Sequence, residues 1–160
     1  QVRTISFDGF YSFANVLNCL PHREAMVSSL RAIAGMLRCG ACGFVDVWNI
    51  APLLQLGTRD TVREFSTPLG HYVQVMNAML DRESQVLDIE YRLFSQRPAD
   101  ELWSLVRSRH RLYVLTLQKY FNIFSEAGFD VRRILLQRPR TEQGLATEND
   151  RLVSFVLRRV

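Results

Sequence analysis

One continuous pattern dominates the 160-residue sequence and runs from Thr67 to Gly128. Apolar residues recur at helical spacing on both sides of a short polar break at residues 95–98, which is typical of two amphipathic helices. Thr67 and Pro68 suit a helix start, and Gly128 suits a helix end. Two helices joined by so short a loop pack antiparallel. The pattern therefore predicts a long helical hairpin over residues 68–127.

Capping residues and apolar spacing predict further helices around this hairpin. Asp8 is placed to cap one helix, and Pro21 suits the first turn of the next. Helices are expected at residues 10–20, 21–38, 58–65, 131–137 and 149–159, with a polar loop at 139–148. Residues 43–50 have a β-like pattern, and a short strand against residues 2–7 is left open. The expected fold class is all-α, a bundle of about five or six helices.

The composition is that of an ordinary globular chain. Apolar residues make up 48% and charged residues 22% of the sequence, whereas disordered chains are poorer in apolar residues. No repeat, low-complexity tract or flexible linker divides the chain, so residues 1–160 are expected to form a single helical domain. Because the first residue is Gln1, we expect this domain to be excised from a longer chain.

Membrane insertion and secretion are not expected. The longest apolar runs are far shorter than the ~20 residues that span a bilayer, and no secretory signal is visible. The sequence has three cysteines, which are too few for a disulfide scaffold and cannot all be paired because their number is odd. These features predict an intracellular location, in the cytoplasm or the nucleus.

Two pairs of potential zinc ligands stand close together in the sequence, Cys19 with His22 and Cys39 with Cys42. Cysteine and histidine hold zinc tetrahedrally, and Cys39 to Gly43 resembles the knuckle of a zinc ribbon. The predicted helix between the pairs is about 25 Å long, however, and would hold them apart. We therefore expect no metal and no cofactor, and a structural zinc belongs only to the alternative function below.

No catalytic signature is recognisable. The sequence contains no Gly-x-Ser-x-Gly elbow, no P-loop and no Gly-x-Gly-x-x-Gly turn. Cys39 and Cys42 follow a predicted helix end, where the helix dipole disfavours a reactive thiolate. His71 and His110 lie out of register by roughly 14 residues in the predicted hairpin. We therefore expect no catalytic residue and no enzyme.

Positive charge is concentrated toward the end of the chain. Residues 107–160 carry 11 basic and 5 acidic side chains, and 19 of the 20 basic residues of the whole sequence are arginine. Arginine recognises carboxylate and phosphate groups. A candidate surface for an anionic partner consists of Arg132, Arg133, Arg138 and Arg140. Because no aromatic stacking platform accompanies them, a basic nucleic-acid-binding module is only the alternative function.

The second arm of the predicted hairpin points to a protein partner. Its apolar arc over residues 102–124 is wider than one packed helix face requires. Arg109 interrupts this arc, which predicts a buried ion pair with Glu83 or Glu90, while Arg107 and Arg111 point in other directions on a helix. The leading prediction is a non-enzymatic helical interaction or assembly domain that binds a protein partner, either as a homodimer or in a larger assembly.

Overall fold

The computed structural model describes residues 6–98, 102–136 and 151–160. The chain divides into two compact units. Unit 1 comprises residues 1–55 and 113–160, and unit 2 comprises residues 56–112. No helix among the described residues is both long enough and apolar enough to cross a membrane.

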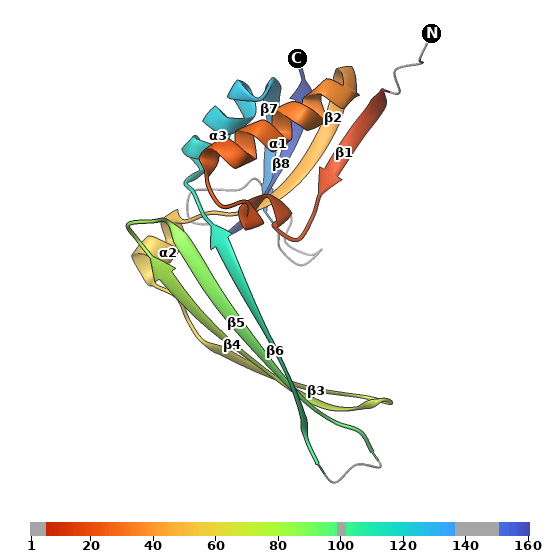
Figure 1. The fold of residues 1–160 in the computed structure, drawn as a ribbon, viewed down its shortest axis with the longest axis vertical. Coiled ribbons are helices and arrows are strands. Elements are labelled where there is room, and N and C mark those ends of the chain that lie inside the picture. Colours follow the sequence, from red (N-terminus) through yellow and green to blue (C-terminus); the bar gives the residue numbers. More distant parts are fainter. Residues whose placement is uncertain (1–5, 99–101, 137–150) are drawn as a thin grey trace. The chain divides into compact units, whose positions relative to one another are not determined.

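Strands, and not helices, account for most of the described residues, so the predicted all-α bundle is wrong. In chain order the elements are β1 (Phe7–Ser12), the 3-10 helix η1 (Val16–Cys19), α1 (Arg23–Met36), β2 (Leu37–Trp48), α2 (Ala51–Leu56), β3 (Thr61–Thr67), β4 (Gly70–Asp81), β5 (Val86–Gln96), β6 (Ser104–Tyr113), α3 (Leu117–Glu126), β7 (Phe129–Leu136) and β8 (Leu152–Arg159). They form two separate four-stranded sheets, one in each unit (Figure 1).

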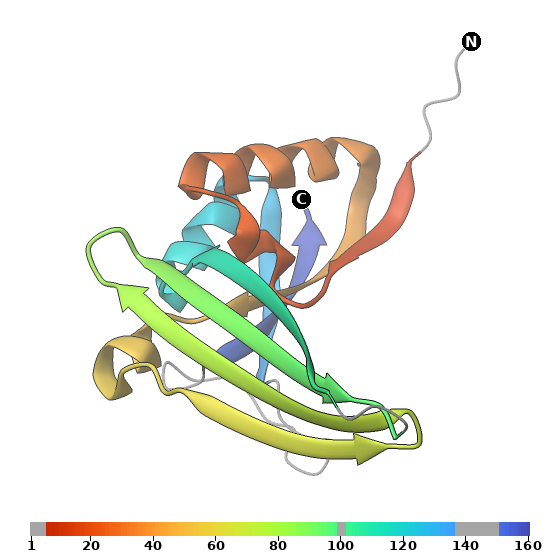
Figure 2. The same cartoon turned by 60° about the horizontal axis from the view of Figure 1, so that its bottom comes forward.

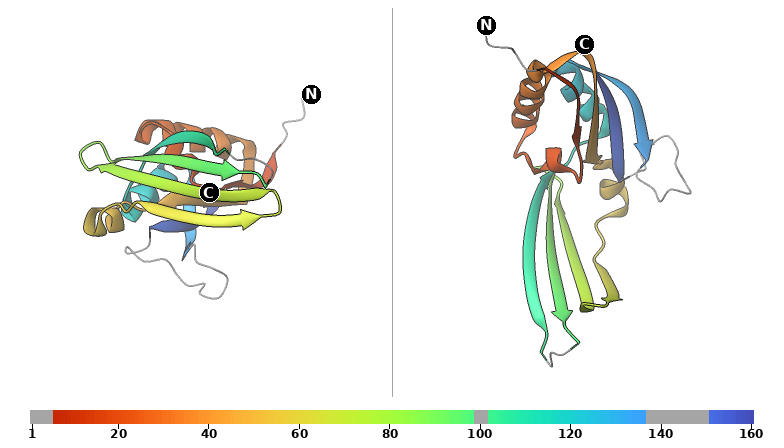
Figure 3. Two further views of the ribbon diagram at one scale, coloured as in Figure 1. Left: turned by 90° about the horizontal axis from the view of Figure 1, so that it is seen from below. Right: turned by 90° about the vertical axis from the view of Figure 1, so that its right-hand side faces the viewer.

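Unit 1 is a layered α/β structure. Its strands follow the order β1-β2-β8-β7, with β1 parallel to β2 and with β8 antiparallel to both of its neighbours. Helix α1 connects the two parallel strands, and α1 and α3 lie beside each other on one face of the sheet (Figure 3). A parallel pair joined by a helix is the unit from which doubly wound α/β folds are built.

Alternation along the strands places the core of unit 1 between this sheet and its helices. Val45 pairs with Phe155, and Val47 pairs with Val153, and all four side chains are fully buried. Helix α1 contributes Met26, Val27 and Leu30 to the same core. The helix predicted at 21–38 is thus present, and the His22 ring accepts a hydrogen bond from the Ala25 amide as its N-cap.

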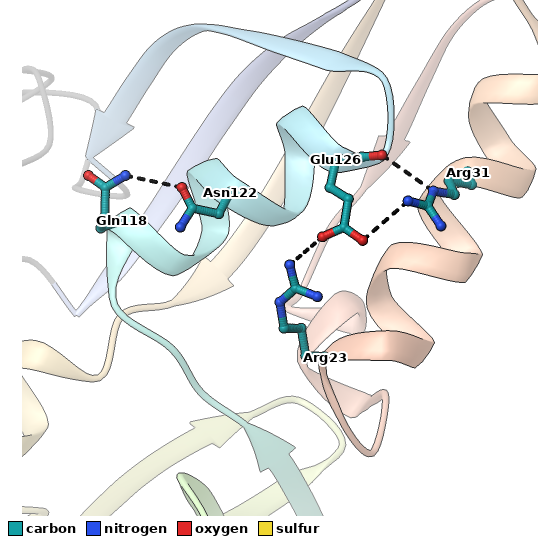
Figure 4. A network of polar contacts seen from close by, with 5 residues as sticks. All are labelled: Arg23, Arg31, Gln118, Asn122 and Glu126. Carbon is teal, nitrogen blue, oxygen red and sulfur yellow. Dashed lines mark hydrogen bonds and ion pairs between the residues drawn. The ribbon is translucent and has the colours of Figure 1, made fainter.

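An ionic clamp joins the two helices at the surface (Figure 4). The Glu126 carboxylate at the end of α3 is held by both Arg23 and Arg31 of α1. Arg31 also donates to the Glu126 carbonyl oxygen at 3.3 Å. Because all three side chains are partly exposed to solvent, the two ion pairs stabilise the helices only weakly.

Unit 2 is an antiparallel meander in the order β3-β4-β5-β6, where the sequence predicted a helical hairpin (Figure 2). Two turns explain the difference. Between β3 and β4, Thr67 accepts from the Leu69 amide, and a Cβ on Gly70 would lie 2.4 Å from the Gln96 carbonyl oxygen. Between β4 and β5, the Asp81 carboxylate accepts from the amides of Glu83 and Ser84. Such local hydrogen bonds favour turns over a continuing helix.

The apolar residues of this region fit both periodicities, which is why the helix prediction failed. Tyr72, Met76 and Leu80 are spaced as on one helix face, yet they also share one face of β4 because their sequence positions differ by even numbers. Val73 and Val75 supply apolar side chains to the other face. Strand and helix were therefore not distinguished by the spacing alone.

Only the end of the predicted hairpin is helical, as α3 over Leu117–Glu126. The other predicted helices, apart from 21–38, are wrong. Residues 10–20 contain the end of β1 and η1, residues 58–65 contain part of β3, and the two C-terminal segments form β7 and β8. The strand left open at 43–50 exists within β2, but its parallel partner is β1, Phe7–Ser12, and not residues 2–7. The predicted polar loop at 139–148 lies outside the described residues.

Candidate functional site

The carboxyl ends of the parallel strands β1 and β2 form the strongest candidate site. β1 ends at Ser12, and β2 ends at Trp48. In open α/β sheets, ligands bind at the edge where parallel strands end, because loops and helix starts converge there. The residues that follow these two strands are therefore the first to consider.

The chain is strained directly after β1. Ala14 and Asn15 have φ angles of 54° and 60°, in the left-handed region that residues with a side chain rarely adopt. Asparagine tolerates this region, but alanine is destabilised there by about 1–2 kcal/mol. Strain of this kind persists only where the surrounding structure enforces it, and it clusters at ligand sites.

Asn15 presents an unsatisfied polar atom at the same place. Its Oδ1 atom is buried, and no hydrogen-bond donor among the described residues reaches it. A buried carbonyl oxygen without a donor costs about 1–3 kcal/mol. Because the protein encloses this atom, a ligand that carries an N–H or O–H group would reach it, and remove that cost, only after the loop that follows β1 moves.

Asn18 anchors the loop that carries Asn15. Its side chain is fully buried in η1, where its Oδ1 accepts from the Trp48 amide at 3.0 Å. Its Nδ2 donates to the Tyr113 carbonyl at 2.8 Å and to the Tyr120 hydroxyl at 2.6 Å. One amide thereby connects the segment after β1 to the end of β2 and to the start of α3.

The Tyr120 hydroxyl completes this network. It donates to the Trp48 carbonyl at 3.0 Å and accepts from the Leu115 amide at 3.2 Å as well as from Asn18. Desolvation raises the pKa of Tyr120 far above its ordinary value, although the hydrogen bond from Asn18 opposes this shift. The tyrosine is thus a neutral positioning residue, and the network holds the strand ends rigidly in place.

The sequence analysis missed Asn15, Asn18 and Tyr120. The first two were assigned to a helix, where polar residues on an apolar face suggest no site. A usable signal was present, since two asparagines interrupt the apolar run of residues 10–20. Tyr120 was assigned to the apolar arc of a helix, and sequence spacing cannot indicate that its hydroxyl meets Asn18.

The predicted anionic-partner surface is described only in part. Arg132 and Arg133 lie in β7, both exposed, and Arg132 forms an ion pair with Asp130 at 3.0 Å. Arg138 and Arg140 lie outside the described residues. The surface formed by the four arginines therefore stays a prediction.

A second group of arginines shares one face, contrary to the helix-based analysis. Arg107, Arg109 and Arg111 alternate along the exposed strand β6, so their side chains point the same way. Arg109 and Arg111 both bind Asp88 of β5. The predicted partners Glu83 and Glu90 were wrong because they were chosen for helical register. The hydrogen bond from Arg111, reinforced by Arg109, holds the pKa of Asp88 below its ordinary value.

The potential zinc ligands are not brought together. Cys19 lies in η1 and His22 caps α1, whereas Cys39 and Cys42 lie in β2. Over the described parts of the chain, no three His, Cys, Asp or Glu side chains are grouped closely enough to hold a metal ion. The alternative function with a structural zinc has no support in this geometry.

The two hairpin histidines occupy different surroundings within unit 2. The His71 ring in β4 contacts the Ser66 hydroxyl at 2.9 Å and the Glu64 carboxylate at 3.1 Å. The His110 ring in β6 packs edge-to-face against Tyr91, with the ring centres 5.5 Å apart.

Comparison with known proteins gives a fold but no family. No protein-family model matches the sequence, and no curated protein matches it. Among solved structures, the chain resembles an S-adenosylmethionine-dependent methyltransferase from Clostridium acetobutylicum ATCC 824, with a TM-score of 0.76, 8% identity and coverage of 96% of this chain. It also resembles CalS10, an amino pentose methyltransferase from Micromonospora echinaspora, with a TM-score of 0.71, 16% identity and 98% coverage. A third is the sugar N-methyltransferase KedS8 from Streptoalloteichus sp ATCC 53650, with a TM-score of 0.71, 15% identity and 97% coverage.

These likenesses concern the fold, and the chain spans only 57–59% of the length of these three structures. They overturn the expectation of a non-enzymatic helical interaction domain, since the fold is one found in methyltransferase structures. The nucleic-acid-binding alternative receives no support from them.

The residues at this edge fit S-adenosylmethionine in part. The Asn15 Oδ1 atom requires a donor, and S-adenosylmethionine offers an ammonium group, ribose hydroxyls and an adenine amino group. The 160 residues contain no Gly-x-Gly-x-x-Gly turn, the element that lets a backbone approach a nucleotide closely. The described edge therefore holds one unpartnered acceptor atom and lacks such a turn.

Proposed function

We propose that this protein takes part in methyl transfer from S-adenosylmethionine, with the cofactor bound against the loop that follows β1. The observation that carries the proposal is the shared fold, which extends over 96–98% of this chain in the three structures compared. The unsatisfied Asn15 oxygen at the ligand edge supports it independently. Because two of the compared proteins act on sugars, a sugar amine is the acceptor that we favour.

S-adenosylmethionine, when bound, would supply an electrophilic methyl group on its sulfonium. The residues of this chain bind and orient. Asn15 accepts a hydrogen bond from the cofactor, while Asn18 and Tyr120 fix the loop that carries it. This preorganisation lowers the entropic cost of binding.

Cofactor binding can be tested without any activity measurement. Titration of the purified protein with S-adenosylmethionine in a calorimeter should show saturable binding. Asn15→Gly removes the side-chain acceptor, and glycine tolerates a φ of 60° without strain. Loss of one hydrogen bond of about 0.5–1.5 kcal/mol should weaken binding roughly two- to tenfold.

Ala14→Gly is the matched control, since Ala14 has nearly the same backbone conformation but no polar side-chain atom. This variant should bind the cofactor like the wild type. Absence of binding to the wild type, or equal binding to Asn15→Gly, would reject the proposed cofactor position. Transfer of labelled methyl groups from the cofactor to amino sugars then tests the reaction itself.

A further inference from the structure

A hollow in the sheet of unit 2 has the lining of a ligand site. Its volume is about 310 Å³, and it is lined by Gln74, Tyr91, Leu93, Val106, Ser108 and His110. The lining residues come from three neighbouring strands, β4, β5 and β6. All of them belong to unit 2, so the hollow is complete within one compact unit.

Strand pairing explains why these side chains share a face. Gln74 pairs with Leu93 across β4 and β5, and Tyr91 lies two residues from Leu93, so these three side chains point the same way. Val106, Ser108 and His110 alternate along β6 and close the other side. The opposite face of β6 carries the three arginines. On the face of the hollow, Arg63 of β3 pairs with Gln74 and lies beside the lining, of which it is not a member.

The chemistry of the lining is amphipathic and free of carboxylate, lysine and arginine side chains. The rings of Tyr91 and His110 stand at 84° to each other and form an aromatic corner. Leu93 and Val106 add apolar surface. Within the part of the chain that the structure describes, the Gln74 amide and the Ser108 hydroxyl have no hydrogen-bond partner, so both are available to a ligand.

We propose that this hollow binds a saccharide. A sugar ring presents C–H groups that pack on aromatic and aliphatic surface, and hydroxyl groups at its rim that pair with amide, hydroxyl and imidazole groups. The volume lies at the lower end of the range for small-molecule sites, which suits one sugar ring. An uncharged lining disfavours a strongly anionic ligand. The inference rests on the proposed function only in taking this saccharide as the methyl acceptor.

The test is a titration of the isotopically labelled protein followed by two-dimensional NMR, without S-adenosylmethionine. D-Glucosamine is the probe, and cyclohexylamine is the matched amine without hydroxyl groups. Glucosamine should shift amide resonances of β4, β5 and β6 in a saturable manner, while cyclohexylamine should not. Gln74→Leu keeps the size of the side chain but removes its amide, and should weaken glucosamine binding roughly two- to tenfold.

Tyr91→Ala should weaken glucosamine binding further, because it removes the aromatic platform. Tyr72→Ala is its control, since Tyr72 lies on the same sheet, stacks on Phe65 and does not line the hollow. His110→Leu should also weaken glucosamine binding. His71→Leu is its control, because His71 does not line the hollow. The amide spectrum of each variant shows directly whether the sheet remains folded.

Three results would overturn the proposal. They are no saturable shift with glucosamine, equal shifts with cyclohexylamine, and unchanged glucosamine affinity in folded Gln74→Leu and Tyr91→Ala variants. Failure of the proposed function is distinguishable from these results. If the protein binds glucosamine in the hollow but does not bind S-adenosylmethionine, the proposed saccharide site stands and only the proposed methyl transfer is rejected.

Discussion

The Tyr120 hydroxyl oxygen lies 2.6 Å from the Asn18 amide nitrogen, although 102 residues separate them in the sequence, and both side chains are fully buried. This contact joins the loop after β1 to the first turns of α3. The hydroxyl also serves the Trp48 carbonyl and the Leu115 amide, so it satisfies three groups at once.

Removal of this hydroxyl is the first test of the network. Tyr120→Phe leaves the Asn18 amide, the Trp48 carbonyl and the Leu115 amide each short of one partner. Since an unsatisfied buried group costs about 1–3 kcal/mol, we expect the free energy of unfolding to fall by about 3 kcal/mol after partial relaxation. Tyr11→Phe is the control, because Tyr11 is 74% exposed and should lose almost nothing. Equal stabilities of the two variants in chemical denaturation would contradict the network.

The buried Asn18–Tyr120 pair predicts that the free energy of unfolding depends on pH in the alkaline range. Burial raises the pKa of Tyr120 above its ordinary value of 10.0, so above pH 10 the unfolded chain loses this proton while the folded chain keeps it. The stabilisation is complete below pH 10 and is lost as the pH rises beyond it. The stability difference between wild type and Tyr120→Phe should narrow by about 1 kcal/mol between pH 9 and pH 11. A constant difference would show that Tyr120 titrates in the folded protein.

Asp88 provides a test of the exposed ion pairs in unit 2. Arg109 and Arg111 are 69% and 71% exposed, so Asp88→Asn should cost less than about 1 kcal/mol at neutral pH. Because the pKa of Asp88 is lowered in the folded state, its contribution is present above pH 3.8 and is lost as the pH falls below that value. Denaturation should show a difference in the free energy of unfolding between wild type and Asp88→Asn at pH 7 but not at pH 2. A loss above about 2 kcal/mol would indicate the buried pair that the helical prediction required.

Gly43 tests the close approach of β1 and β2. A Cβ atom at this position would lie 2.1 Å from a carbon of the Phe10 ring. Gly43→Ala should therefore destabilise unit 1 by about 1–3 kcal/mol, as overpacking does in other cores. Gly35→Ala is the matched control, since nothing lies within 4 Å of its Cβ and the position is helical. The Gly35→Ala control should be more stable than the wild type by about 0.5–1 kcal/mol. A Gly43→Ala variant as stable as wild type would contradict the packing.

The expected protein partner stays a prediction, and β1 offers a place to test it. Among the described strands, β1 lies at a sheet edge, where Tyr11 is 74% and Phe13 is 52% exposed. Parallel strands are normally covered, and an unpaired edge invites pairing. Light scattering should show a homodimer that Tyr11→Lys weakens, whereas Leu69→Lys, at an exposed turn of unit 2, should not. A strict 18.5 kDa monomer over about a hundredfold concentration range would exclude self-association.

The sequence by itself determined the features that depend on neighbouring residues. Helix α1 was predicted because its apolar spacing and its proline lie within about twenty residues. The structure shows it over Arg23–Met36, with Pro21 before its N-cap, and not over 21–38. The absence of a glycine-rich nucleotide turn was equally visible. Residues 70–113 were not determined in this way, since their apolar residues suit both a helix and a strand, and only the turns at Gly70 and Asp81 separate the two. The end of the predicted hairpin does form helix α3, Leu117–Glu126.

Tertiary structure decided the sheets and the candidate site. Strands β2 and β8 pair through Asp46 and Ser154, and the Asn18–Tyr120 contact spans a similar distance along the chain. Such pairings lower the free energy only once distant segments meet, so no local spacing encodes them. Arg107, Arg109 and Arg111 illustrate the consequence, because the same three residues diverge on a helix and align on a strand. The unsatisfied oxygen of Asn15 became visible only when the fold enclosed it.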